Sequence, residues 1–234
     1  MDRAHRQELK HDKFVDQVGQ GIEYASGHRT QVIRYAIVAA VVVAVAAGGW
    51  AWMKQQESVR QDALRVAVRS QEAQIGQPNT AFMIGFADQK TKEVAVQKAW
   101  QDLASKHGGS TEGVVAEYYL GVNAADQGNL PEAEKRLKLV ADSGKSPYSS
   151  QAKLSLARVY SSLGKNGEAE KMLRSLMNEP TILVSKEEAT LALGRLLATT
   201  NQAEARKLLE PLRSSRGPIS RAAISTLSEI PAAR

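Results

Sequence analysis

The 234-residue sequence predicts an all-α protein, with a single N-terminal transmembrane helix followed by a helical-repeat domain of the α-solenoid kind. Three observations predict this class. One apolar stretch without charges is long enough to cross a bilayer. One short pattern recurs three times at a constant step of 36 residues. Aromatic residues make up only 5 % of the chain, and this favours helices because strands prefer β-branched and aromatic side chains.

Charge and composition exclude several function classes. The net charge is +6, but basic and acidic residues are interspersed and no run of five like charges exists, so we expect no nucleic-acid partner. The chain has no cysteine, which excludes disulfides, thiolate metal sites and cysteine nucleophiles. No phosphate-binding loop, nucleophile elbow or paired-carboxylate motif occurs. We therefore expect no catalytic, metal-binding or cofactor-binding residues, and a protein that is not an enzyme.

Residues 1–34 form a short tail with a partly amphipathic pattern. Phe14, Val18 and Ile22 repeat at every fourth position, which is typical of a helix that lies on a membrane surface or docks on a partner. Glycines at three positions between 19 and 27 weaken a continuous helix. A mobile tail is the equal alternative.

Residues 35–53 read YAIVAAVVVAVAAGGWAWM and carry no charge. As a helix they span roughly 28 Å, close to the thickness of the hydrocarbon core of a bilayer. Arg34 and Lys54 bracket the stretch, and Tyr35, Trp50 and Trp52 stand at its edges, where such rings prefer the headgroup level. The charged tail is too long for a cleaved signal peptide. The stretch therefore predicts a transmembrane signal anchor in the lipid bilayer.

Within this anchor, small residues recur at every fourth position and predict a contact surface for another membrane helix. They are Ala36, Ala40, Ala44 and Gly48. Such a stripe allows close helix approach, although alanine is also simply common in this segment. The basic residues near the anchor divide between its two sides, so the positive-inside rule does not choose an orientation.

The repeat domain is predicted over residues 54–234. The string E-A-x-K-x-L-x-x-[V/L] begins at Glu132, Glu168 and Glu204. Before each copy lies another helical pattern that ends in a turn, and prolines 147, 180 and 218 punctuate the ends of the units. Each unit therefore reads as helix, turn, helix, with clear units at about 114–147, 150–180 and 185–218.

A diverged first unit is expected at about 57–107. It combines a helix that continues out of the anchor, Glu57–Ile75, with a second helix near Lys92–His107. The string Gln77-Pro78-Asn79 breaks the first of these helices, and Gly108-Gly109-Ser110 separates the unit from the next. A short terminal helix at about 221–230 is predicted to cover the last exposed seam.

The order Leu-Gly, then Gly, then Ala-x-x-x-Leu, then Pro resembles the tetratricopeptide repeat. Two departures are that Glu117 and Lys153 stand where that repeat has an early aromatic, and that the period is longer. With its tail, single span and emerging helix, the chain also resembles the YfgM-like family, ancillary subunits of the bacterial Sec translocon. That resemblance implies the bacterial inner membrane, a cytoplasmic N-terminus and a periplasmic repeat domain.

Tetratricopeptide repeats expose a concave surface lined by the first helix of each unit. Transferring their inward positions predicts a protein-binding groove, which mixes apolar anchors with two arginines. Its residues are Tyr118, Val122, Asp126, Leu154, Arg158, Ser162, Leu191, Arg195 and Thr199. Such a surface suits peptide backbones, acidic termini or extended clients. The alternative is that these residues pack between units or face water.

The predicted function is a non-enzymatic, membrane-anchored adaptor for protein interactions. The resemblance implies that it assists a translocon and periplasmic chaperones in handling envelope proteins. Its expected partners are a membrane protein, either a translocon or a membrane chaperone, and unfolded or extended protein clients. The alternative is a structural scaffold of another envelope complex, for secretion or division, that binds no clients.

Overall fold

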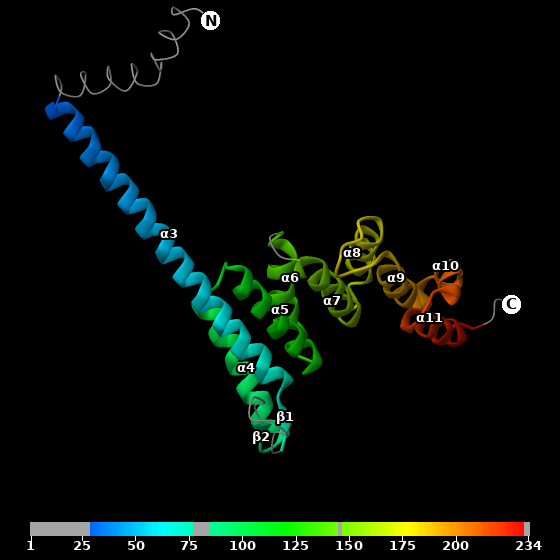
Figure 1. Ribbon diagram of the computed structural model, residues 1–234. Helices are drawn as coiled ribbons and strands as arrows, with labels where there is room; N and C mark the ends of the chain where they lie inside the picture. The colour runs from blue at the N-terminus through cyan, green and yellow to red at the C-terminus, as the bar shows by residue number, and fades with distance from the viewer. Residues whose placement is uncertain (1–28, 77–84, 145–146, 232–234) are drawn as a thin grey trace, which may run out of the picture. The chain divides into compact units, whose positions relative to one another are not determined.

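The computed structural model describes residues 29–76, 85–144 and 147–231, and these are almost entirely helical (Figure 1). The helices are α3 (Arg29–Glu72), α4 (Gln89–Lys106), α5 (Thr111–Asp126), α6 (Leu130–Asp142), α7 (Tyr148–Ser162), α8 (Asn166–Asn178), α9 (Lys186–Thr200), α10 (Gln202–Leu209), the 3-10 helix η1 (Glu210–Ser214) and α11 (Pro218–Glu229). The predicted all-α class is confirmed.

One small sheet was not predicted. The strands β1 (Gln74–Ile75) and β2 (Gly85–Phe86) pair in parallel, with Gln74 opposite Gly85. The helix expected to reach Ile75 therefore ends at Glu72, because the next residues pair with a strand instead. The amphipathic positions of the tail and the predicted break at Gln77-Pro78-Asn79 lie outside the described residues.

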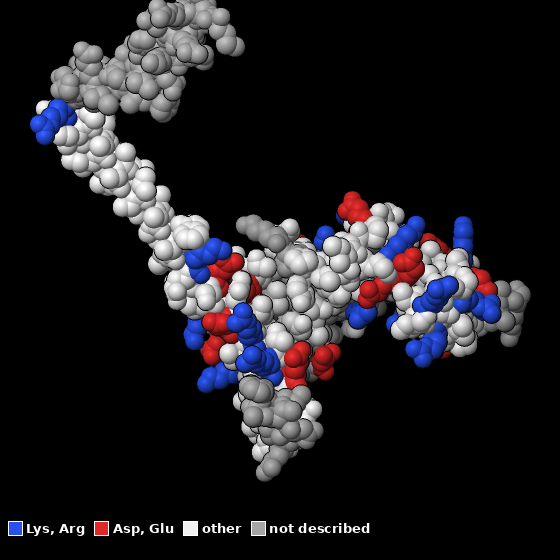
Figure 2. All heavy atoms as spheres, viewed as in Figure 1, with Lys and Arg blue, Asp and Glu red and all other residues white. Residues whose placement is uncertain are grey.

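The chain divides into two compact units, Met1–Ser58 and Val59–Arg234. The described part of the first unit is the N-terminal portion of α3, a helix that is long and apolar enough to cross a membrane. Its large apolar side chains are exposed, as Tyr35 at 74 % and Val45 at 70 % illustrate. Figure 2 shows a stretch of this helix with neither blue nor red spheres. The segment therefore presents uncharged apolar surface around its circumference.

The second unit begins with a core built around Trp100 of α4. This side chain is fully buried, and its ring stacks on that of Tyr119 from α5, with the centroids 4.4 Å apart. Its indole Nε1 donates a hydrogen bond to Oε1 of Gln71, near the end of α3, at 3.1 Å. Ala67, one turn earlier, is also fully buried in the same cluster. The C-terminal part of α3 thus packs with α4 and α5.

The repeated string places its apolar residues in one continuous core. Its alanines are fully buried. Because these side chains on the second helix of each pair are small, the first helix can approach closely and cover them. Its later positions are also buried. The buried positions are Ala133, Ala169 and Ala205; Leu137, Leu173 and Leu209; and Val140, Leu176 and Leu212. Consecutive helices from α4 to α10 are neighbours in space, so each pair covers the apolar face of the next.

Glycine on the first helix completes this close approach. A Cβ added to Gly121 of α5 would lie 2.8 Å from Cγ of Leu137 in α6, and one added to Gly194 of α9 would lie 2.5 Å from Cδ2 of Leu209 in α10. Both distances are too short for carbon atoms. In the middle pair the corresponding residue is Ala157, so the spacing between α7 and α8 admits a methyl group.

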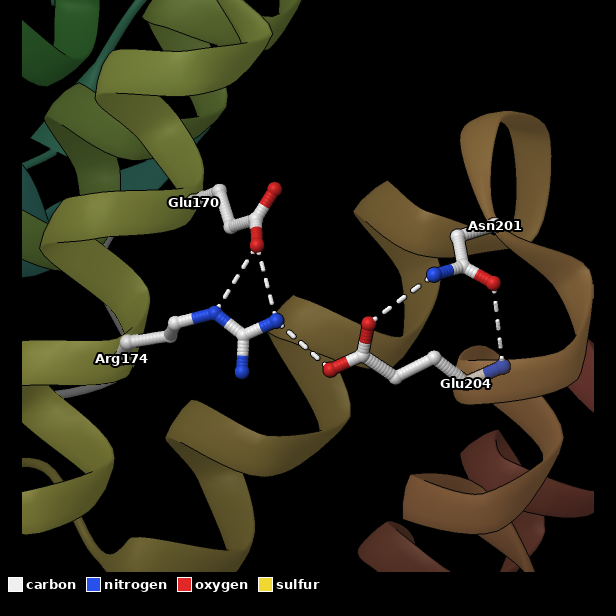
Figure 3. A network of polar contacts seen from close by, with 4 residues as sticks. All are labelled: Glu170, Arg174, Asn201 and Glu204. Carbon is white, nitrogen blue, oxygen red and sulfur yellow. Dashed lines mark hydrogen bonds and ion pairs between the residues drawn. The ribbon is translucent and has the colours of Figure 1, made fainter.

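Polar side chains near one repeat position connect the second helix of each unit to the unit that follows it. Glu134 of α6 accepts a hydrogen bond from Nζ of Lys165 at 2.8 Å. Glu170 of α8, 36 residues later, binds Arg174, whose Nη2 reaches Oε1 of Glu204 in α10 at 2.6 Å (Figure 3). Arg206, a further 36 residues on, donates from Nη2 to the carbonyl oxygens of Ile230 and Pro231, each at 2.7 Å. Side chains at this position, or at Arg174 one turn beyond it, therefore connect each second helix to the unit that follows.

The prolines start helices as well as following them. Pro147 is the residue just before α7, and Pro218 is the first residue of α11, where its missing N–H leaves no hydrogen bond unmade. All three prolines lie between units, but Pro147 and Pro218 stand at the start of the next helix rather than directly after the previous one. Only Pro180 follows a helix directly, after the cap of α8. The terminal helix begins at Pro218 rather than near residue 221, because proline is well suited to the first position of a helix.

Candidate protein-binding groove

A pocket of about 590 Å³ lies among α7, α8, α9 and α11. Its lining is mostly apolar, with three arginines and one glutamate. The lining residues are Ala157, Arg158, Ser161, Leu173, Glu188, Leu191, Ala192, Arg195, Leu196, Arg216, Pro218, Ile219 and Ala222. Three of the residues predicted from the sequence are among them: Arg158, Leu191 and Arg195.

The stacking of the repeats explains why Arg158 and Arg195 line the same pocket. Each follows the small residue that packs against its partner helix, Ala157 in α7 and Gly194 in α9. The two arginines therefore occupy corresponding positions on the first helices of neighbouring pairs, and α7 and α9 are in contact. Both arginine side chains are exposed, so their charges face the pocket rather than the core.

The charges of this pocket lack acidic partners within the described part of the chain. Nε of Arg195 is 3.4 Å from Oγ1 of Thr226, a long hydrogen bond to a neutral group. Among the described residues, Arg158 and Arg216 have neither a hydrogen bond nor an ion pair from their side chains.

Two arginines elsewhere in the unit are held by carboxylates. Arg174 binds Glu204 and Glu170, and hydrogen bonds to these two carboxylates raise the pKa of its guanidinium. Arg136 binds Glu117 and Glu132, each at 2.6 Å. The arginines of the pocket therefore differ from Arg136 and Arg174, because no described carboxylate already holds their guanidinium groups.

The structure does not bring the residues of the first predicted repeat into this pocket. Tyr118 is half-buried, with its ring 5.2 Å from that of Tyr148 and its hydroxyl 3.4 Å from Oε1 of Gln151. Val122 is also half-buried and packs against the main core. Asp126 is exposed and lines a separate polar cavity of about 420 Å³ beside α4 and the end of α3.

Three further predicted residues are placed differently than expected. Leu154 is only 2 % exposed and belongs to the core, so its assignment to a groove surface is corrected. Ser162 and Thr199 are exposed but do not line the pocket, and the hydroxyl of Thr199 donates to the carbonyl oxygen of Leu196. The neighbouring Ser161 lines it instead of Ser162.

Sequence reasoning missed one wall of the pocket. Arg216, Pro218, Ile219 and Ala222 come from the segment that begins α11. The terminal helix was predicted only as a cover for the last seam. The apolar residues on its buried side were the available signal, but nothing in the repeat pattern specifies where a helix outside the repeat will dock.

Three further kinds of feature could form a site: the small-residue stripe of α3, another cavity, and a group of metal-binding side chains. The small residues Ala36, Ala40, Ala44 and Gly48 are exposed along α3, and a Cβ added to Gly48 would meet nothing within 4 Å. A third cavity, of about 510 Å³, lies between α7, α8 and the loop that leads to α9. Within the described ranges, no group of three or more His, Asp or Glu side chains is arranged to hold a metal ion.

A family model described as a tetratricopeptide repeat-like domain matches residues 28–206. The matched range begins just before α3 and ends within α10, so it includes Arg158 and Arg195 but not Arg216 or α11. No curated protein and no solved structure matches the chain.

Proposed function

Because the chain belongs to the tetratricopeptide repeat-like domain family, we propose that it is a non-enzymatic adaptor that binds other polypeptides while anchored in a membrane. Repeat domains of this class act by presenting an extended surface to a protein partner. The observation that carries the proposal is the pocket among α7, α9 and α11, where arginines that form no ion pair with any described residue surround an apolar floor.

The apolar part of α3 supports the anchor. Uncharged side chains that are exposed all around a helix have no favourable place in water, and a bilayer would cover them. Following the resemblance to the YfgM-like family, the protein would lie in a bacterial inner membrane with its N-terminus in the cytoplasm. The repeat domain would then face the periplasm, beside a translocon.

Topology is tested with a reporter fused after Arg234. Alkaline phosphatase is active only outside the cytoplasm, and green fluorescent protein exported in the unfolded state fluoresces only inside it. We expect phosphatase activity and no fluorescence from the matched pair of fusions. Fluorescence without phosphatase activity would exclude a periplasmic role.

A membrane partner is tested with photo-crosslinkers in α3. We expect probes at Ala40 and Ala44 to capture a membrane protein, either a translocon subunit or a membrane chaperone, because small residues permit close helix contact. A probe at Val42 is the matched control, since it points to the opposite side of the helix. Equal capture at all three positions would mean that the stripe is not a specific contact.

Client binding is tested by changing Arg158 and Arg195 together to glutamine. Capture of unfolded or extended polypeptides by the full chain should fall, because the two charges line the same pocket. Unchanged capture would remove this pocket from the adaptor function. It would leave the protein as a scaffold of a membrane complex.

A further inference from the structure

The lining of the pocket among α7, α9 and α11 has three arginines and one glutamate, so it carries a net positive charge beside an apolar floor. We propose that it binds a polypeptide segment in which an apolar side chain is flanked by acidic side chains, and that the arginines select the acids. The inference rests on the proposed adaptor function and names the class of segment that this function handles.

The floor explains the apolar part of the ligand. Ala192 of α9 and Ile219 and Ala222 of α11 are half-buried, so they keep apolar surface open to the pocket. Leu191 and Leu196 close its base with only 8 % of their surface exposed. A volume of about 590 Å³ lies within the range of roughly 300–1,000 Å³ that is typical of ligand pockets. An apolar side chain that enters it exchanges part of its contact with water for contact with this floor.

The arginines explain the acidic part. Arg158 comes from α7, Arg195 from α9 and Arg216 from the segment before α11, so positive charge approaches the pocket from three elements. A guanidinium binds a carboxylate with two parallel hydrogen bonds, and no described side chain already occupies these arginines in that way. Glu188 is the one acidic residue of the lining, so the lining as a whole is positive.

The combination favours a peptide over a phosphate-bearing surface. A lipid headgroup or a nucleic acid would use the charges but would leave the apolar floor unused. A wholly apolar segment would use the floor and leave three charges without partners. Acidic residues beside an apolar one satisfy both features within the reach of the same pocket.

The binding test uses the full chain in nanodiscs of zwitterionic lipid and a fluorescein-labelled peptide with leucine between glutamates. Two matched peptides replace either the glutamates by glutamine or the leucine by serine. By fluorescence anisotropy, we expect the leucine–glutamate peptide to bind about tenfold more tightly than either one, because charged hydrogen bonds and apolar burial both contribute. Its affinity should also fall as salt is added.

The matching protein variants locate the site. Arg158→Gln combined with Arg195→Gln should weaken binding of the leucine–glutamate peptide about tenfold, and should abolish its preference over the glutamine peptide. Lys207→Gln combined with Arg221→Gln removes the same amount of charge from exposed positions outside the pocket, and should leave affinity unchanged. Thermal melts of both variants by circular dichroism show whether each is folded.

Different failures have different meanings. Equal binding of the glutamate and glutamine peptides would overturn acid selection, while the adaptor function would stand. Displacement of the peptide by vesicles of anionic phospholipid would assign the pocket to a membrane surface and overturn the peptide ligand. If no peptide binds but the full chain still captures unfolded or extended polypeptides, the pocket is not the binding site. If the full chain captures no such polypeptide either, the adaptor function itself is wrong.

Discussion

Single residues decide how closely the helices of each pair approach. Changing Gly194 to Ala should destabilise the repeat unit by about 1–3 kcal/mol, because its Cβ would overlap Leu209 and force the side chain or helix to move. Urea unfolding measures this effect. Gly167→Ala is the matched control, since nothing lies within 4 Å of its Cβ. It should stabilise the protein by about 0.5–1 kcal/mol through helix propensity. A destabilisation of equal size at both positions would contradict the close-packing account.

Also at the residue scale, the ion pair between Arg174 and Glu204 should couple two repeats (Figure 3). A double-mutant cycle with glutamine at each position should give a coupling free energy of about 0.5–1 kcal/mol that falls with added salt. The matched cycle uses Arg213 and Glu210, which are more exposed and three residues apart, and should give nearly zero. Equal coupling in the two cycles would mean that the pair between repeats has no special role.

Burial against the neighbouring rings raises the pKa of Tyr119 to about 12, and a hydrogen bond with Tyr148 adds to the effect. The folded state holds this proton more tightly than the unfolded state, whose tyrosine titrates near pH 10. The resulting stabilisation is complete below about pH 10 and is lost as the pH rises to about 12. The difference in ultraviolet absorbance between the native chain and Tyr119→Phe should show a transition near pH 12. A transition near pH 10 would contradict burial of the hydroxyl.

At the scale of elements, two of the three repeated second helices begin with the same cap. Asn129 and Asn201 accept hydrogen bonds from the backbone N–H groups of Glu132 and Glu204, whereas Lys165 precedes α8 without a side-chain cap. Replacing Asn129 or Asn201 by alanine should therefore cost about 1 kcal/mol of unfolding free energy. Asn166→Ala, one position beyond Lys165, is the control and should cost less by chemical denaturation. Equal losses at all three asparagines would show that the caps contribute nothing distinct.

The same elements show what the sequence could and could not reveal. The buried positions of α6, α8 and α10 could be recognised because equivalent contacts in successive repeats need side chains of similar size. Ala133, Ala169 and Ala205 are an example. Leu154 was wrongly assigned to the groove surface, because α7 contacts helices on several sides and these helices bury it. The sequence pattern of one helix does not specify how much of its surface the neighbouring helices cover. The pairing of β1 with β2 and the docking of α11 against α9 depend on contacts outside the repeat, so no periodic signal marks them.

For the whole molecule, the chain combines an apolar helix with a repeat unit that has its own core. Two of the three arginines of the pocket could be predicted from the sequence, because Arg158 and Arg195 occupy corresponding repeat positions. The other wall of the pocket, formed by Arg216 and the apolar start of α11, could be identified only from the structure. The proposed adaptor would place a polypeptide-binding surface next to a membrane.

The most direct test of that account is site-specific photo-crosslinking in living cells, read in carbonate-washed membranes. A probe at Ser161, an exposed residue of the pocket, should yield adducts with other polypeptides in the washed membrane fraction. A probe at Ser228, exposed on α11 outside the pocket, should yield few. Loss of the protein from the washed membranes, or equal adducts at Ser161 and Ser228, would contradict a membrane-anchored adaptor that binds polypeptides through this pocket.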